Sequence, residues 1–252
     1  MDPVWLGGAG WLAQCLRGEP VATYVLVHGA WSGGYVFRRV RPLLRSHGHE
    51  VYTPTLTGLG ERSHLASPQV TLTTHVQDVV NVLRYEDLQN VVLLGFSYGG
   101  FVVTGAIGHV GDRVRHLVYL DAFLPGDGDT LVGLTGRPST GGVLALGEQW
   151  LVPPLPRDYE DAAEEAFAAP RRTPHPAGCF TEPVRLPRPL EEYPFSRTYV
   201  KATDDPATDG PFWTAARRVR SSPAWNYREI ATNHVVPVNR PDELGALLLD
   251  LA

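Results

Sequence analysis

The chain has 252 residues, 43% of them hydrophobic, with a formal net charge of −5 and a sequence pI of about 6.0. This size and composition fit one globular domain with a full-sized core. The net negative charge argues against a surface that binds nucleic acid. The basic cluster at 217–220 is interpreted as the solvated face of a surface helix. No run of about twenty apolar residues is present, so we expect no membrane span.

The two cysteines, Cys15 and Cys179, do not have metal-ligand spacing and cannot form a disulfide framework. We therefore expect no metal site and a reducing, cytoplasmic location. Residues 1–20 have neither a basic start nor a long apolar run, which argues against a secretory signal. They are interpreted as an N-terminal extension to a domain at 21–252. The sequence leaves the oligomeric state open, a homodimer included.

Strands and helices alternate along the first half of the chain. Short β-branched and aliphatic runs predict strands at 24–27, 50–53, 91–94 and 114–120. Apolar residues at helical spacing predict helices at 35–46, 73–84 and 100–107. This order predicts an α/β fold, in which a mostly parallel sheet is flanked by helices on both faces.

The alternation breaks at about 123–195, a stretch rich in Gly and Pro with one short predicted helix at 158–168. A segment of this length between core strands is an inserted sub-domain rather than a loop. The sheet pattern resumes with predicted strands at 197–202 and 225–230, and a final helix is predicted at 242–251.

A candidate nucleophile follows the strand at 91–94, where residues 95–99 read Gly-Phe-Ser-Tyr-Gly and fit the pattern G-x-S-x-G. A buried strand precedes this pentapeptide and a helix follows it. On such a sharp turn Ser97 points away from the sheet at a helix N-terminus, and the glycines allow close packing. The strand, turn and helix together favour Ser97 as a nucleophile.

A serine nucleophile needs a base and a group that orients the base. His234 follows the last strand and is the candidate base, because ligands bind at the carboxyl ends of parallel strands. Three aspartates at strand ends compete as the orienting acid: Asp204 and Asp205 after the strand at 197–202, and Asp121 after the strand at 114–120. We favour Asp205 from its position, with the other two as alternatives.

The oxyanion of a tetrahedral intermediate needs backbone donors. One candidate is the amide of Tyr98, directly after the nucleophile, and the other is the amide of Ala30 in the loop after the first strand. Gly29 allows that loop to approach the substrate. His28 in the same loop is interpreted as a structural hydrogen-bonding residue rather than a base.

These motifs resemble the α/β-hydrolase superfamily, in the branch that holds methyl-salicylate-type esterases, hydroxynitrile lyases and small bacterial esterases including pyrethroid hydrolases. The resemblance rests on His-Gly-Ala-Trp-Ser-Gly at 28–33, Gly-Phe-Ser-Tyr-Gly-Gly at 95–100, the strand-end motif at 199–205 and His234. It implies that Asp205 rather than Asp204 is the acid, and that the insertion at about 123–195 is a cap. The lyases of this branch carry a threonine and a lysine where this chain has Gly29 and Val235, so the resemblance favours ester hydrolysis.

We therefore expect a cofactor-free serine esterase acting on a small or aromatic, moderately hydrophobic carboxylic ester. Aromatic residues would line its pocket, with Trp31, Trp150 and Phe167 as candidates. Two alternatives remain open on the same fold. One is hydrolysis of a lactone or a carbon–carbon bond with the same three residues, and the other is a small-ligand receptor without catalysis.

Overall fold

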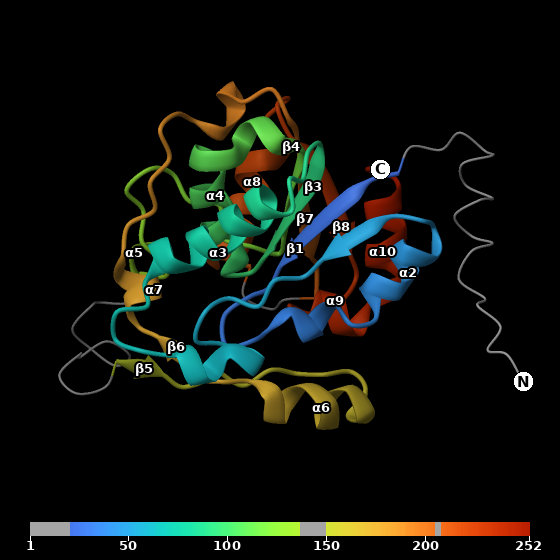
Figure 1. Cartoon of the computed structure of the whole chain (residues 1–252). Coiled ribbons are helices and arrows are strands. Elements are labelled where there is room, and N and C mark those ends of the chain that lie inside the picture. Colours follow the sequence, from blue (N-terminus) through green and yellow to red (C-terminus); the bar gives the residue numbers. More distant parts are fainter. Residues whose placement is uncertain (1–20, 137–149, 205–207) are drawn as a thin grey trace, which may run out of the picture.

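The computed structural model describes residues 21–136, 150–204 and 208–252, and its centre is a six-stranded sheet (Figure 1). The strand order is β2-β1-β3-β4-β7-β8, and every neighbouring pair is parallel. The strands are β1 (Thr23–Val27), β2 (Glu50–Tyr52), β3 (Val91–Phe96), β4 (Val114–Leu120), β7 (Ser196–Ala202) and β8 (Asn226–Ile230). The predicted α/β fold with a mostly parallel sheet is confirmed.

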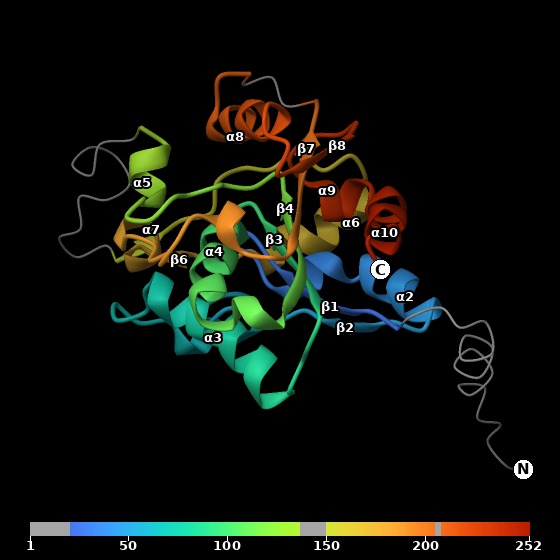
Figure 2. The same cartoon turned by 90° about the horizontal axis from the view of Figure 1, so that it is seen from above.

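Helices cover both faces of the sheet (Figure 2). On one face lie α3 (Leu72–Tyr85), α4 (Gly99–Val110) and α8 (Pro211–Arg220). On the other lie α2 (Val40–Ser46), α9 (Val236–Asn239) and α10 (Pro241–Leu249). The apolar spacing that predicted α3 buries one stripe of that helix, whereas α4 is buried almost all round because it lies between the sheet and α3. Among the described residues, no helix is long and apolar enough to cross a bilayer.

One predicted helix is divided in the structure, and another follows a short additional helix. The helix expected at 35–46 is a 3-10 turn, Gly34–Phe37, followed by α2, and Pro42 lies in the first turn of α2. A first-turn residue has no intrahelical partner for its N–H, so proline is tolerated there. The helix expected at 242–251 is preceded by the separate short helix α9, and α9 and α10 each carry proline in the first two positions.

The chain between β4 and β7 forms short elements at one end of the sheet (Figure 1). We call the described residues of this segment the cap. Its elements are α5 (Leu131–Leu134), β5 (Leu151–Val152), α6 (Ala162–Ala168), β6 (His175–Pro176) and α7 (Gly178–Thr181). Strands β5 and β6 pair antiparallel. Helix α6 begins later than the predicted 158, because Asp161 caps it by accepting from the amides of Ala163 and Glu164.

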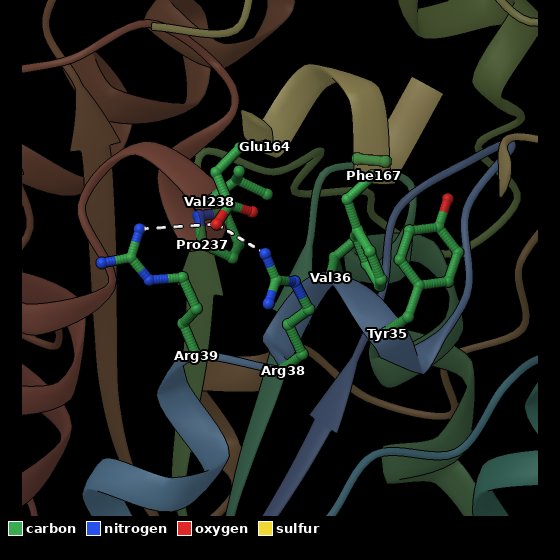
Figure 3. A pocket seen from close by; sticks show the side chains of 9 residues that line it. Tyr35, Val36, Arg38, Arg39, Glu164, Phe167, Pro237 and Val238 are labelled. Carbon is green, nitrogen blue, oxygen red and sulfur yellow. Dashed lines mark hydrogen bonds and ion pairs between the residues drawn. The ribbon is translucent and has the colours of Figure 1, made fainter. Parts of the chain in front are cut away.

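Helix α6 is attached to the sheet domain through a charged and an aromatic contact (Figure 3). Glu164 Oε1 accepts from Arg38 Nη2 at 2.5 Å and lies 3.7 Å from Arg39 Nη1. Beside it, the ring of Phe167 packs edge-on against Tyr35 at 6.1 Å and lies under the Arg38 guanidinium at 4.2 Å. The cap is therefore held against the 3-10 turn and the start of α2.

We predict that Gly34→Ala destabilises the fold, because the added Cβ would lie 2.2 Å from the carbonyl oxygen of Thr53. Such overpacking typically costs about 1–3 kcal/mol. Gly126→Ala is the matched control, since its Cβ would meet nothing nearer than 3.6 Å, and its effect should stay within about 0.5 kcal/mol. Urea unfolding of the three proteins measures the difference; equal free energies of unfolding would contradict the prediction.

Candidate active site

Ser97 lies on a tight turn between β3 and α4. Its φ is +56°, in the left-handed region, which marks a strained backbone for a non-glycine residue. The turn is held from both sides: the Ser97 amide donates to the Leu120 carbonyl at 3.2 Å, and the Ser97 carbonyl accepts from Gly100 and Phe123. A Cβ at Gly99 would lie 2.7 Å from the Val27 carbonyl oxygen, so glycine is required for this approach.

His234 follows β8 and faces the serine. Its Nε2 is 2.9 Å from Ser97 Oγ, which is hydrogen-bond distance. The imidazole ring is stacked on Phe212 with ring centroids 4.8 Å apart and an interplanar angle of 6°, and Phe96 lies on it at 5.1 Å. These aromatic contacts fix the ring plane, so that one nitrogen points at Ser97.

The other ring nitrogen, Nδ1, lies 2.6 Å from Oδ2 of Asp121, at the end of β4. Asp121 is fully buried, and its Oδ1 accepts from Lys201 Nζ at 2.7 Å and from the Ala202 amide at 3.3 Å. Burial raises the pKa of the Asp121 carboxyl, but the hydrogen bond and charge of His234, together with Lys201, outweigh burial and hold this pKa below its ordinary value. The carboxylate that contacts His234 is therefore ionised at neutral pH.

This geometry changes the expected acid. Asp205, favoured from the sequence, lies outside the described residues, and the Nδ1 of His234 is occupied by Asp121 instead. Asp204 is exposed, and its amide donates to the Thr232 carbonyl at 3.0 Å. Asp121 was the remaining alternative, and the physical reason it takes the position is that β4 lies next to β3 in the sheet, beside Ser97. Among the described residues, the carboxylate that contacts His234 is therefore that of Asp121 and not the expected Asp205.

The loop after β1 lies directly against the nucleophile turn. A Cβ added at Gly29 would lie only 2.9 Å from Ser97 Cβ, which is too close for a side chain. The backbone of this loop therefore lies directly against the side chain of Ser97. His28 fixes the loop: its Nε2 accepts from the Leu56 amide at 3.0 Å and its Nδ1 donates to the Gly29 carbonyl at 2.8 Å. This is the structural role expected from the sequence. Ala30 follows in this loop.

A cavity of about 30 Å³ lies against the serine. Its lining residues come from the β1 loop, the nucleophile turn, the cap and the region around α9: Gly29, Ala30, Ser32, Val36, Phe96, Ser97, Arg157, Tyr159, Arg172, His234, Val235, Pro237 and Val238. Trp31, Trp150 and Phe167, the expected pocket aromatics, are not part of this lining. Trp31 is buried with its indole donating to the Val152 carbonyl, Trp150 accepts from the Ala177 amide, and Phe167 lines a neighbouring pocket (Figure 3).

Beneath the cap, ligand atoms of His75, His175 and Cys179 lie within 4.8 Å of one another. Their hydrogen bonds do not fit a metal site. His75 Nε2 must carry its hydrogen, because it contacts the Thr57 carbonyl at 2.8 Å, and its Nδ1 faces the Tyr98 hydroxyl at 3.0 Å. His175 Nδ1 accepts from the Trp31 amide, which leaves the hydrogen on Nε2. Burial also raises the pKa of the Cys179 thiol, which keeps this thiol protonated in the folded protein.

Comparison with known proteins agrees with this fold. The model of the alpha/beta hydrolase family matches residues 24–247, so the chain belongs to that family. The family predicted from the motifs is thereby confirmed.

Relatives of known activity also resemble the chain over most of its length. It is 36% identical to a carbendazim hydrolyzing esterase from a Nocardioides species, over 92% of this chain and all of that protein. It is 32% identical to a pyrethroid hydrolase from Sphingobium wenxiniae, over 73% of this chain and 71% of that protein. Among solved structures, an extracellular alpha/beta-hydrolase from a Paenibacillus species superimposes with a TM-score of 0.76 at 26% identity, covering 92% of this chain and 98% of the other.

Sequence reasoning missed several residues at this site, and Lys201 is the one that a clear signal could have found. A lysine inside a strand of a covered sheet is buried and needs a carboxylate partner. Which aspartate it pairs with depends on the strand order, which places Asp121, at the end of β4, beside Lys201. The cap residues Arg157 and Arg172 had no such signal, because they lie outside the predicted helix at 158–168 and in no predicted strand.

We predict that the protein loses stability as the pH falls from 6.5 towards 4. Burial lowers the pKa of His28 and His75 to about 4 and that of His175 further, whereas all three take up protons near pH 6.5 when unfolded. Stability is therefore complete above pH 6.5, and each histidine costs about 2 kcal/mol at pH 5. Together they cost about 6 kcal/mol, which is comparable with the whole stability of many domains.

Urea unfolding midpoints measured across this pH range test the prediction. His28→Gln should make the decline shallower by about one proton, whereas His64→Gln, at an exposed position, should leave the slope unchanged. A flat stability profile between pH 6.5 and 4.5 would show that these histidines are not held neutral by the fold.

Proposed function

We propose that the protein is a serine hydrolase that cleaves carboxylic esters through Ser97, His234 and Asp121. One observation supports this most directly: Ser97 Oγ, His234 and the Asp121 carboxylate form a continuous chain of contacts at 2.9 and 2.6 Å. In such a chain the base activates the hydroxyl, and the acid fixes the tautomer of the base. Placement of the three groups at the ends of β3, β4 and β8 agrees with how ligands bind α/β sheets.

The reaction proceeds in two steps. Ser97 Oγ attacks the ester carbonyl carbon while His234 Nε2 takes the hydroxyl proton, and the imidazolium is stabilised by Asp121. The amides of Ala30 and Tyr98 stabilise the oxyanion, in keeping with the close approach of the Gly29 loop to the serine. His234 then returns the proton to the departing alcohol, leaving an acyl group on Ser97. Water, deprotonated by the same histidine, cleaves this acyl-enzyme to the acid and restores the serine.

The two relatives named above, an esterase and a pyrethroid hydrolase, support an ester as the substrate class. Hydrolysis of a lactone breaks the same acyl–oxygen bond and needs no other group. A receptor role is less well supported, because an aligned base and nucleophile contribute nothing to ligand binding alone. The substrate proposed from the sequence, a small or aromatic and moderately hydrophobic ester, is retained, with the cap as the segment that sets its size.

We predict that the native protein hydrolyses p-nitrophenyl esters and that Ser97→Ala lowers kcat/KM by at least about 10⁴-fold, because no other group can form the acyl-enzyme. A series from acetyl to dodecanoyl, followed by p-nitrophenolate release, gives both the activity and the acyl length that the site accepts. Activity that survives in Ser97→Ala would assign hydrolysis to another group and refute the proposed nucleophile.

We predict that Asp121→Asn lowers kcat by about 10³- to 10⁴-fold, since the amide favours the wrong tautomer of His234. Asp205→Asn is the matched control and should retain activity. Because Asp121→Asn leaves Lys201 buried without its anion, circular dichroism must first show a folded protein, and the pair Asp121→Asn with Lys201→Met offers a second background. An active Asp121→Asn beside an inactive Asp205→Asn would return the role to Asp205.

A further inference from the structure

Two arginines of the cap line the cavity that contains Ser97. Arg157 lies between β5 and α6, and Arg172 follows the 3-10 turn after α6. Both share the cavity with Gly29, Ser97 and His234. They are therefore the cationic groups that a molecule bound at the serine would meet on the cap side.

Neither arginine has an acidic partner within the described residues, where no Asp or Glu oxygen lies within 4.0 Å of either guanidinium. Asp158 and Asp121 favour the charge of Arg157 without contacting it. Among the other acids, Glu164 pairs with Arg38, and Glu160 pairs with Arg240. The Asp121 carboxylate itself contacts Lys201 and His234. Both guanidinium groups at the cavity are therefore without an ion pair among the described residues.

The hydrogen-bonding groups of these arginines are also incompletely used. Arg172 Nη1 donates to the Leu155 carbonyl at 2.5 Å, but its Nη2 is buried with no partner. Arg157 Nη1 donates to the adjacent Pro156 carbonyl at 3.3 Å. An unsatisfied buried donor on a charged group is costly, and a guanidinium offers several donors in a planar fork that matches a carboxylate. The hydroxyl of Tyr159, in the same lining, adds a further polar group.

Burial lowers the pKa of Arg157, and the positive charge of Arg172 nearby lowers it further. Burial likewise lowers the pKa of Arg172. Arginine remains protonated at neutral pH even so, and the two groups therefore repel each other across a partly desolvated cavity. An anion between or beside them would relieve both the repulsion and the missing hydrogen bonds.

We propose that Arg157 and Arg172 bind a carboxylate group carried by the substrate, so that the enzyme prefers esters whose molecule bears a negative charge away from the scissile bond. This rests on the proposed ester hydrolysis at Ser97. The carboxylate can belong to the acyl part, as in a half-ester of a dicarboxylic acid, or to the alcohol part. In either case the arginines hold one end of the substrate while the ester carbonyl lies at the serine.

The experiment compares kcat/KM for matched charged and neutral esters. For the acyl side the pair is mono-p-nitrophenyl glutarate and p-nitrophenyl valerate. For the alcohol side it is 4-acetoxybenzoate and methyl 4-acetoxybenzoate. Native protein is compared with Arg157→Gln, Arg172→Gln and the double variant. The control is Arg171→Gln, because Arg171 lies on the Phe167 ring outside the cavity.

We expect the native protein to prefer the charged member of at least one pair. Each cavity variant should lower kcat/KM for that ester by about 10- to 100-fold, the usual effect of losing a hydrogen bond to a charged group, and the neutral ester should change by less than about 3-fold. Arg172→Lys should recover part of the loss, and Arg171→Gln should change neither ester. The pair in which the preference appears identifies the side that carries the carboxylate.

Two results would overturn the proposal: equal losses for charged and neutral esters, which indicate a purely structural role, or a neutral preference that the variants leave unchanged. Failure of the proposed function looks different, because no ester would then be turned over or Ser97→Ala would stay active. In that case calorimetric binding of glutarate to native protein and to the double variant still tests the arginine pair. Equal binding, or no binding to either protein, would refute it.

Discussion

The fully buried carboxylate of Asp121 is the group on which the arrangement of the site depends. A charge without access to water is strongly unfavourable unless it is paired and hydrogen-bonded. Lys201, also fully buried, supplies the charge, the Ala202 amide supplies a donor, and His234 occupies the remaining oxygen. The same contacts that stabilise the buried carboxylate therefore hold the His234 imidazole at Ser97, so the stability of the fold and the orientation of this ring have one origin.

The order of the strands brings the Asp121–His234 pair to Ser97. Because β1, β3 and β4 are parallel neighbours, their carboxyl ends meet at one edge, and the Ser97 amide is hydrogen-bonded to the last carbonyl of β4. The glycines let three segments of backbone come together there. A Cβ at Gly95 would lie 2.6 Å from the Gly99 carbonyl oxygen, and one at Gly100 would lie 2.1 Å from that of Phe123. Glycine at these positions leaves the space that the strained turn at Ser97 needs.

The sequence was sufficient for the strands of the large sheet and for expecting Ser97 and His234 to lie together at strand ends, because each follows a run whose pattern and length identify it. It was not sufficient for the acid, since Asp121, Asp204 and Asp205 all satisfy the rule of lying at a strand end. Strand order decides between them, and strand order depends on long-range packing rather than on local pattern. Within the cap the sequence predicted only the helix at 158–168, because the other elements are two to four residues long and carry no period. The expected aromatic lining, with Trp31, Trp150 and Phe167, followed from composition alone, whereas the cavity at Ser97 includes Arg157, Tyr159 and Arg172.

The arginines in and around the cap fall into two groups, those that have an acidic partner and those that do not. Arg38 and Arg39 form ion pairs with Glu164 on α6 and hold the cap to the sheet domain, so an acidic partner compensates their charge in the folded protein. Arg157 and Arg172 are turned to the cavity, and the buried Nη2 of Arg172 has no acceptor. A cap that only needed to be attached would not require two unpaired cations beside Ser97, because their desolvation opposes folding. One carbonyl hydrogen bond for each, and the Trp31 ring near Arg157, compensate this desolvation only in part. Compensation by a bound anion is therefore the simplest physical account of why these side chains lie there.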